Sequence, residues 1–134
     1  MKDVVEFLKE NPVQYLATID LEGNPSICPF QFILEFDGKL WFYTSNEKDV
    51  YEHMKKTPNI ELCVCNEKAQ WVRISGLAVF SDNTNVKEKM FEKSSTVKSI
   101  FKNVANPSFE VFYIGNGKAT IYDHSQGEPK EYIV

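Results

Sequence analysis

Residues 13–44 read VQYLATIDLEGNPSICPFQFILEFDGKLWFYT, and this stretch decides the fold class. Apolar residues alternate with polar ones through most of it, which is the two-residue period of a half-buried β-strand. Two sets of turn residues interrupt the pattern, Glu22-Gly23-Asn24 and Asp37-Gly38, and the second is a strong hairpin signal. We therefore predict three successive strands, at residues 13–21, 26–36 and 40–44.

The alternation also predicts which face of each strand is buried. On the first strand, the apolar face carries Val13, Tyr15, Ala17, Ile19 and Leu21. Gln14 and Thr18 fall on its polar face. On the second strand, the apolar face carries Cys28, Phe30, Phe32, Leu34 and Phe36. We assign to the core, without a functional role, Phe30, Phe32, Leu34, Phe42 and Leu62.

Outward from this stretch, the spacing of apolar residues predicts helices at 3–10, 47–56 and 84–103, the last divided at Ser94-Ser95. Further strands are expected at 60–64, 70–81, 109–114 and 119–122. Gly115-Asn116-Gly117 allows a tight turn or a bulge between the last two. The polar residues after Asp123 are expected to be loose. Strands in meander order with helices inserted between them predict a mainly β protein, an antiparallel barrel or sandwich with helical decoration.

Length and composition set the class of protein. The chain has 134 residues, 43% of them hydrophobic, with 10 Phe, 6 Tyr and 2 Trp. We therefore expect one domain, residues 1–134, with a substantial core rather than a disordered chain. No apolar run approaches the roughly 20 residues that span a bilayer. The first ten residues lack the apolar segment of a signal peptide, so we expect a cytoplasmic protein.

Charge and metal-binding residues exclude two further classes. The formal net charge is −4, and Arg73 is the single arginine, so we expect no nucleic-acid surface. Three cysteines without a CxxC pair indicate neither a disulfide scaffold nor a zinc site. The two histidines, His53 and His124, are isolated, and we expect no metal site. Phosphate-loop, dinucleotide and nucleophile-elbow motifs are missing, so any chemistry would come from a bound cofactor.

The segment Thr44-Ser45-Asn46, followed by Lys48, is the first candidate site. It joins a predicted strand to a predicted helix, and the exposed amides and dipole of a helix N-terminus attract anions. Two hydroxyls and an ammonium could complete a phosphate-binding site. The alternative is ordinary helix capping, because Ser, Thr and Asn are preferred N-caps and the acidic Glu47 and Asp49 suit a first helical turn.

Two further features could bind a planar ligand. Trp71 and Arg73 share one face of a predicted strand, where a ring and a guanidinium could stack on a ligand, or where the arginine could simply lie over the aromatic ring. Pro29 interrupts the second strand and indicates an edge strand, a bulge or a ligand close to the backbone. Phe30 and Gln31 follow this position. Cys28 precedes it and could touch a ligand, although a role in the core is the alternative.

The order of these features resembles the flavin-binding split-barrel family typified by pyridoxamine 5′-phosphate oxidase, and more closely its small general-stress and nitroimidazole-resistance-like members. The resemblance covers about residues 13–121. It is carried by Tyr15-Leu16-Ala17-Thr18-Ile19-Asp20 with Gly23 and Pro25, Cys28-Pro29-Phe30, Leu40-Trp41-Phe42-Tyr43-Thr44-Ser45 with Lys48, Asn59-Ile60-Glu61-Leu62, and Trp71-Val72-Arg73-Ile74-Ser75-Gly76.

The resemblance implies a homodimer of six-stranded antiparallel split β-barrels with one FMN at each end of the interface. It implies that residues 26–31 run along the isoalloxazine ring and ribityl chain, and that Lys48 is a phosphate ligand. Trp71 and Arg73 would lie near the flavin, often that of the other subunit. The cofactor-binding residues expected on this basis are Ser26, Cys28, Pro29, Phe30, Gln31, Tyr43, Thr44, Ser45, Lys48, Trp71 and Arg73.

The sequence departs from the oxidase at three basic positions, where it has Ser26, Gln31 and Glu47. This implies weaker retention of FMN. Ser26 and Gln31 have opposite strand parity, so they would face one ligand only across a bulge, for which Pro29 is a candidate. The C-terminal Arg- and His-bearing substrate motif has no counterpart in residues 124–128, so we do not expect pyridoxamine phosphate oxidase activity.

We therefore expect a homodimeric FMN-binding protein with oxidoreductase activity on a small acceptor, fed by a small-molecule donor, with no identified catalytic side chain. The alternatives are a flavin carrier or sensor without activity, the same barrel with haem or a deazaflavin, and a dimer that has lost its ligand. Haem would require His53 or His124 as an axial ligand.

Overall fold

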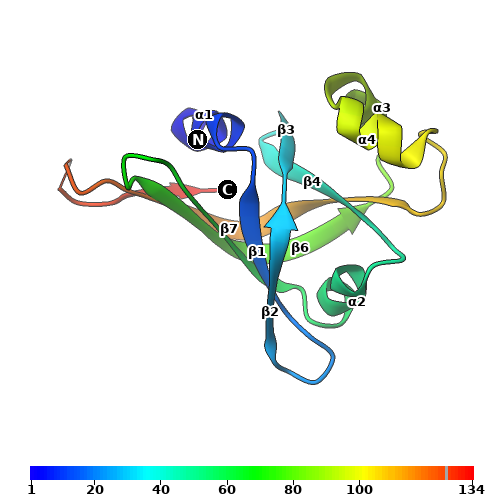
Figure 1. The fold of residues 1–134 in the computed structure, drawn as a ribbon, viewed down its shortest axis with the longest axis horizontal. Coiled ribbons are helices and arrows are strands. Elements are labelled where there is room, and N and C mark those ends of the chain that lie inside the picture. The colour runs from blue at the N-terminus through cyan, green and yellow to red at the C-terminus, as the bar shows by residue number, and fades with distance from the viewer. Residues whose placement is uncertain (126) are drawn as a thin grey trace.

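The computed structural model describes residues 1–125 and 127–134. Figure 1 shows a mainly β protein with four helices at its periphery. The helices are α1 (Lys2–Glu10), α2 (Asp49–Lys56), α3 (Thr84–Lys93) and α4 (Ser95–Phe101). The strands are β1 (Gln14–Ile19), β2 (Pro25–Phe30), β3 (Phe32–Phe36), β4 (Lys39–Ser45), β5 (Asn59–Cys65), β6 (Trp71–Ser81), β7 (Phe109–Tyr122) and β8 (Lys130–Ile133).

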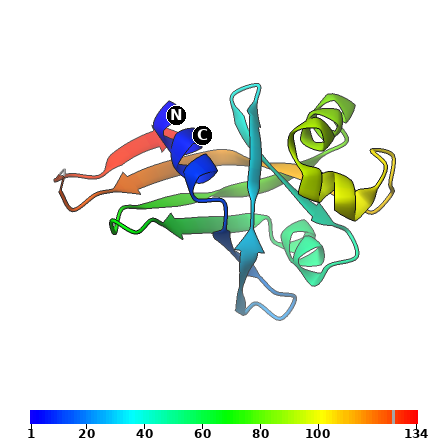
Figure 2. The ribbon, with the colours of Figure 1, turned by 45° about the horizontal axis from the view of Figure 1, so that its top comes forward.

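All strands belong to one antiparallel sheet in the order β2-β1-β5-β6-β7-β4-β3, with β8 beside β7. The two edge strands of this path, β2 and β3, are separated in the chain by Gln31 alone. The sheet must therefore curl until its edges meet at this residue. In Figure 2 the β2–β3 segment accordingly crosses the long strands β6 and β7 steeply. This is the expected antiparallel split barrel.

The described residues form eight strands, whereas the family resemblance implies six, and two features account for the difference. The predicted strand 26–36 divides at Gln31 into β2 and β3, because its first half pairs with β1 and its second half with β4. The tail expected to be loose forms β8, which pairs with β7 from Lys118↔Ile133 to Ile121↔Lys130. Gln126, in the same tail, lies outside the described residues. The meander order also fails twice, since β1 pairs with β5 and β4 with β7.

The two strands predicted at 109–114 and 119–122 are one continuous strand, β7. Of the two alternatives at Gly115-Asn116-Gly117, the structure has the bulge, because the pairing of β6 with β7 shifts between Ser75 and Leu77. Gly76 lies opposite this irregularity. A Cβ atom there would come within 2.8 Å of the Gly115 carbonyl oxygen, so the close approach of the two backbones requires glycine.

The predicted buried face of β1 is wrong. Gln14, Leu16 and Thr18 are 0%, 1% and 3% exposed, whereas Tyr15 is 50% exposed. Polar residues occupy the buried face because their side chains find partners there. Gln14 Nε2 donates to the carbonyls of Leu8 and Asn11, and Gln14 Oε1 accepts from the Phe32 N–H.

Two hydrophobic clusters hold the fold. One fills the barrel and includes Leu16, Phe42, Leu62, Ile74 and Phe112. The other packs α3 and α4 against the outside of β3, β4 and β7, through residues such as Trp41, Met90, Phe101 and Phe109. The predicted core residues Phe32, Leu34, Phe42 and Leu62 are buried, and Phe30 is half-buried. The division of the predicted helix 84–103 is confirmed, since Ser94 caps α4 through the Val97 N–H.

Candidate cofactor site

Strand β2 lies at the sheet edge and presents its backbone to any ligand that approaches there. It pairs with β1 without interruption from Ile19↔Pro25 to Gln14↔Phe30. The bulge considered at Pro29 is therefore absent, and this proline lies on an edge strand. The chain breaks its pairing two residues later, at Gln31, where β2 passes into β3. Ser26 and Gln31 are thus not brought to one face by a bulge.

The two prolines of β2 limit the hydrogen bonds that this edge offers. Pro25, Ile27 and Pro29 are alternate residues of β2, so their backbone groups point in the same direction. The Asp20 N–H donates to the Asn24 carbonyl at 2.8 Å, so even-numbered residues of β2 point their backbone groups toward β1. Odd-numbered residues point theirs outward. Because proline has no N–H, the open edge presents the carbonyls of these three residues but a single donor, the Ile27 N–H.

The even-numbered residues of β2 point their side chains toward the barrel. Ser26, Cys28 and Phe30 are each half-buried, and the last two pack against the barrel core. Burial raises the pKa of the Cys28 thiol, and the ammonium of Lys48 acts in the opposite direction. The lysine at the start of α2 therefore lies within electrostatic reach of β2, so the tertiary structure brings two separate candidate segments together.

A surface cavity of about 390 Å³ joins β2 to β4. It is lined by Pro12, Val13, Pro29, Phe30, Gln31 and Tyr43. Four of these are residues that the sequence indicated as cofactor-binding, and they come from the end of β2, the corner after it and the middle of β4. Burial also raises the pKa of the Tyr43 phenol. Pro12 and Val13, which follow α1, were not predicted to belong to the site.

The segment from Thr44 to Lys48 connects β4 to α2, and none of the proposed caps begins the helix. The N-cap position is Lys48 itself, and no described side chain accepts a hydrogen bond from the first turn. Ser45 Oγ instead accepts from the Glu47 N–H at 3.2 Å. Asn46 Nδ2 donates to the Pro107 carbonyl and to Glu110 Oε2. The Tyr51 N–H donates to the Lys48 carbonyl, whereas no acceptor among the described residues is found for the Asp49 and Val50 N–H groups, which remain available to an anion.

Thr44 adds an unexplained polar group to this segment. Its side chain is 2% exposed, and Oγ1 has no hydrogen-bond partner among the residues that the structure describes. A buried hydroxyl without a partner costs free energy, and a bound ligand is one way to satisfy it. The charge around α2 is mixed, because the exposed Glu47 and Asp49 flank Lys48.

His53 connects α2 to β1 through a polar contact. Its Nδ1 atom lies 3.0 Å from Thr18 Oγ1 on β1. The pKa of the Asp20 carboxyl is lowered mainly by the Asn24 backbone N–H and also by the nearby His53. Local sequence patterns do not predict this contact, because the two residues are 35 positions apart.

Trp71 and Arg73 lie together on the outer face of β6, away from the β2–β4 cavity. Register places Arg73, Cys63, Tyr15 and Pro29 in one row across four strands. Three inter-strand spacings, about 14 Å, separate the ends of that row. Within a single chain, Arg73 therefore does not reach the cavity.

A second aromatic ring joins this group. Tyr122 stacks on Trp71, with ring centroids 3.9 Å apart and an interplanar angle of 10°. The Arg73 guanidinium lies over both rings, 5.1 and 5.7 Å from their centroids, and Arg73 Nε pairs with Glu61 at 3.3 Å. The arginine thus lies over aromatic rings, the simpler of the two interpretations. Tyr122 was missed because its pairing with Trp71 depends on the register of β6 with β7.

Within residues 1–125 and 127–134, no group of three or more His, Cys, Asp or Glu side chains is arranged to hold a metal ion. None of the helices in the described part of the chain is both long and apolar enough to cross a membrane.

Comparison with known proteins gives the family. The family model described as "Pyridoxamine 5'-phosphate oxidase" matches residues 1–125. The chain belongs to this family. A search of curated proteins found no match. Among solved structures, a NimC/NimA family protein from Clostridium acetobutylicum is 34% identical with a TM-score of 0.91, and the match covers 100% of this chain and 92% of that one.

More distant structures share the fold of the pyridoxamine 5′-phosphate oxidase family at low identity. A Clostridium acetobutylicum protein related to general stress protein 26 is 17% identical, with a TM-score of 0.75 over 99% of this chain and 93% of that one. A heme binding protein from Mycobacterium smegmatis is 13% identical, with a TM-score of 0.74 over 93% of this chain and 54% of that one. These two similarities support the split barrel and carry nothing about the ligand of this family member.

Proposed function

We propose that this protein is a flavoprotein that binds FMN at a homodimer interface and has oxidoreductase activity on a small-molecule acceptor. Membership of the pyridoxamine 5′-phosphate oxidase family supports the proposal. The observation that carries the proposal concerns the junction between β4 and α2. The N-terminus of α2 has no side-chain cap, its Lys48 is within electrostatic reach of Cys28 on β2, and it is preceded by the buried Thr44 hydroxyl, which has no partner among the described residues.

The phosphate end of FMN fits the segment from Thr44 to Lys48. Free backbone amides and the positive end of a helix dipole favour an anion. The Lys48 ammonium supplies a positive charge, and the Thr44 and Ser45 hydroxyls supply hydrogen-bond donors. Glu47 and Asp49 oppose a dianion, so we expect weaker binding than a site with several basic residues would give.

The ring end of FMN fits the β2 edge and the cavity next to it. An isoalloxazine ring has an apolar face and a polar rim of carbonyl and imide groups. Phe30, Pro29 and Tyr43 provide an apolar wall, and the Ile27 N–H and its neighbouring carbonyls provide hydrogen bonds at the edge. Gln31 at the corner offers a side-chain amide. The half-buried Ser26 and Cys28 would face the ribityl chain.

A second copy of the chain would complete the site. The outer face of β1 and β2 exposes large apolar side chains, with Val13 at 57%, Tyr15 at 50% and Ile27 at 68% exposure. Such residues in a contiguous patch mark interaction surfaces. Trp71 and Arg73 lie on the same outer face, so a two-fold related partner could bring them to the flavin that its neighbour binds.

FMN, when bound, supplies the electron-transfer chemistry. The residues of this chain bind the phosphate, cover one face of the ring and exclude water from it. We assign no general acid or base. A flavin carrier without activity would use the same residues, so turnover with a reductant and an acceptor separates these two functions.

The test of binding is a fluorescence titration of the purified protein with FMN, with riboflavin and hemin as comparison ligands. We expect saturation at one FMN per chain and weaker binding of riboflavin, which lacks the phosphate. Lys48→Ala should abolish that preference. Lys55→Ala, a lysine in the last turn of the same helix, is the matched control and should leave the preference unchanged.

Two results would overturn the proposal. Absence of FMN binding would exclude a flavin function, and saturable hemin binding in its place would favour a haem protein. Equal affinity for FMN and riboflavin in the unmodified protein would remove the phosphate site from Thr44–Lys48.

A further inference from the structure

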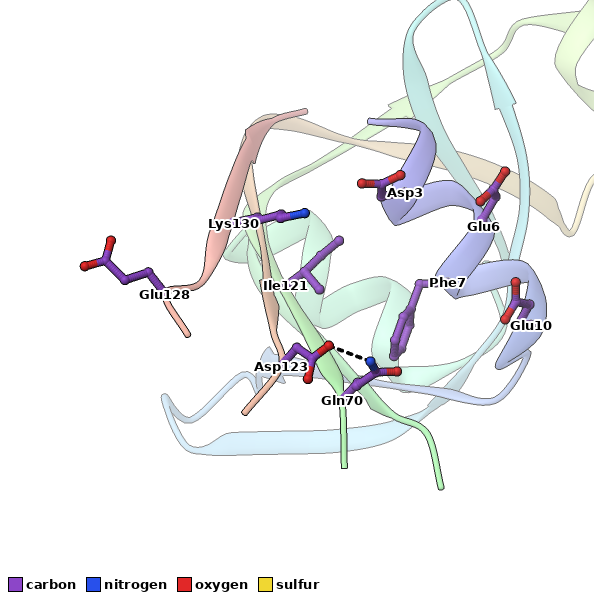
Figure 3. Close-up of a pocket in the computed structure, with 9 residues that line it drawn as sticks. All are labelled: Asp3, Glu6, Phe7, Glu10, Gln70, Ile121, Asp123, Glu128 and Lys130. Carbon is purple, nitrogen blue, oxygen red and sulfur yellow. Dashed lines mark hydrogen bonds between the residues drawn. The ribbon is translucent and has the colours of Figure 1, made fainter. Parts of the chain in front are cut away.

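A second cavity, of about 260 Å³, lies between α1 and the strands at the end of the chain. One wall is the face of α1 formed by Asp3, Glu6, Phe7 and Glu10, which follow helical spacing. The other wall comes from the start of β6 and from β7 and β8 (Figure 3). The cavity shares no residue with the β2–β4 cavity.

The floor of this cavity is apolar. Phe7 and Ile121 are each half-buried and pack against the barrel core from opposite walls. Figure 3 shows both side chains between α1 and the strands. A half-exposed phenyl ring and a branched aliphatic chain that line the same cavity form a surface on which a small apolar body could rest.

The rim of the cavity is strongly acidic. Five carboxylates line it, against one ammonium, that of Lys130. Asp3 accepts a hydrogen bond from the Tyr132 hydroxyl at 2.9 Å, and Asp123 accepts one from Gln70 Nε2 at 2.6 Å. None of the five forms an ion pair with a basic side chain among residues 1–125 and 127–134.

Hydrogen bonds from Ser125 and Gln70 lower the pKa of Asp123. A cavity with an apolar floor and an anionic rim complements a molecule that is apolar at one end and cationic at the other. A neutral apolar molecule would leave the charges unmatched, and an inorganic cation would leave the floor unused.

We propose that this cavity binds a small organic amine, a protonated amino group attached to an aromatic or branched apolar body. The apolar body rests on Phe7 and Ile121, and the ammonium group lies among the carboxylates of α1. Contact between the cation and the Phe7 ring adds to the attraction. The site is independent of flavin binding, because none of its residues belongs to the proposed FMN site.

The test is an NMR titration of the ¹⁵N-labelled protein with 2-phenylethylamine. We expect saturable shifts of the Phe7, Gln70 and Ile121 amides. The uncharged 2-phenylethanol should bind about fivefold or more weakly, and the anionic 3-phenylpropionate should produce no shifts there. Binding of the amine should weaken as the salt concentration is raised, because salt screens ion pairs between the ammonium group and carboxylates near the surface.

Variants that neutralise carboxylates test whether those of α1 bind the amine. Glu6→Gln with Glu10→Gln should weaken amine binding about fivefold. Glu22→Gln, in the β1–β2 turn far from the cavity, is the matched control and should change nothing. Equal binding of the amine and the alcohol, an unaffected double variant, or shifts confined to Gln31 and Tyr43 would each overturn the proposal. FMN binding is measured separately, so failure of one proposal is distinguishable from failure of the other.

Discussion

The side-chain oxygen of Gln14 lies 2.7 Å from the backbone nitrogen of Phe32 and accepts its hydrogen bond. Phe32 is the first residue of β3, immediately after the corner at Gln31, and Gln14 is the first residue of β1. Gln14 Nε2 also donates to the Leu8 and Asn11 carbonyls at the end of α1. One fully buried amide thus joins the helix to the corner at which the barrel closes, next to the candidate flavin cavity.

We expect Gln14→Leu to destabilise the fold. Leucine is similar in size, but it leaves the Phe32 N–H and two carbonyls without partners, at a cost of about 2–4 kcal/mol. Urea denaturation measures the change in the free energy of unfolding. Gln31→Leu, at a half-buried glutamine one residue before Phe32, should stay within about 0.5 kcal/mol. Equal effects of the two substitutions would show that the buried hydrogen bonds of Gln14 contribute nothing.

Thr44→Val and Thr18→Val should differ in their effects on the stability of the flavin-free protein, and equal destabilisation by the two would contradict the assignment. The Thr44 hydroxyl has no partner among the described residues, so its removal should be neutral or stabilise by up to about 1 kcal/mol. Thr18 bonds to His53, so its removal should destabilise by about 1 kcal/mol. Thermal unfolding without FMN compares them.

The same Thr44→Val variant also tests the cofactor site. If the hydroxyl binds FMN, valine should weaken FMN binding about tenfold without lowering the stability of the flavin-free protein. A variant with wild-type affinity for FMN would remove Thr44 from the proposed site without affecting the role of Lys48.

Gly76→Ala should strain the junction of β6 and β7. The new methyl group would lie 2.6 Å from Ile114 Cγ2 and 2.8 Å from the Gly115 carbonyl oxygen, and a backbone atom cannot move aside as a side chain can. We expect a loss of about 1–3 kcal/mol of stability. Ser75→Ala, one residue earlier on β6, should change stability by less than about 0.5 kcal/mol. A tolerated Gly76→Ala would contradict the close backbone approach at this bulge.

Asp20 should contribute to stability in a pH-dependent way. Backbone N–H groups of Asn24 and Glu22 donate to its carboxylate and lower its pKa in the folded state. The contribution is therefore present above the unfolded pKa of about 3.9 and is lost as pH falls through the lower folded value. Asp20→Asn keeps an oxygen acceptor but does not titrate, so its stability should fall less than that of the unmodified protein between pH 5 and pH 3. Identical pH profiles would contradict this assignment.

Local patterns were enough to predict most elements. The two-residue period, the Asp37-Gly38 turn and the Ser94 break in the helical region each depend on neighbouring residues, and each was confirmed. The buried face of β1 was predicted wrongly because burial of Gln14 and Thr18 depends on partners at Leu8, Phe32 and His53. A hydropathy pattern contains no information about such partners.

The sequence by itself determined the fold class, the family resemblance and the segments that carry the candidate cofactor residues, because these follow from the order of residue types along the chain. Only the tertiary structure decided that β2 and β3 become the two edges of one sheet, and that Gln31 is the corner between them. It also brought Lys48 near Cys28, separated Arg73 from Pro29 by two intervening strands, and enclosed a cavity against α1. The physical reason is that strand pairing and side-chain packing join residues far apart in the chain, and their register follows from the whole sheet.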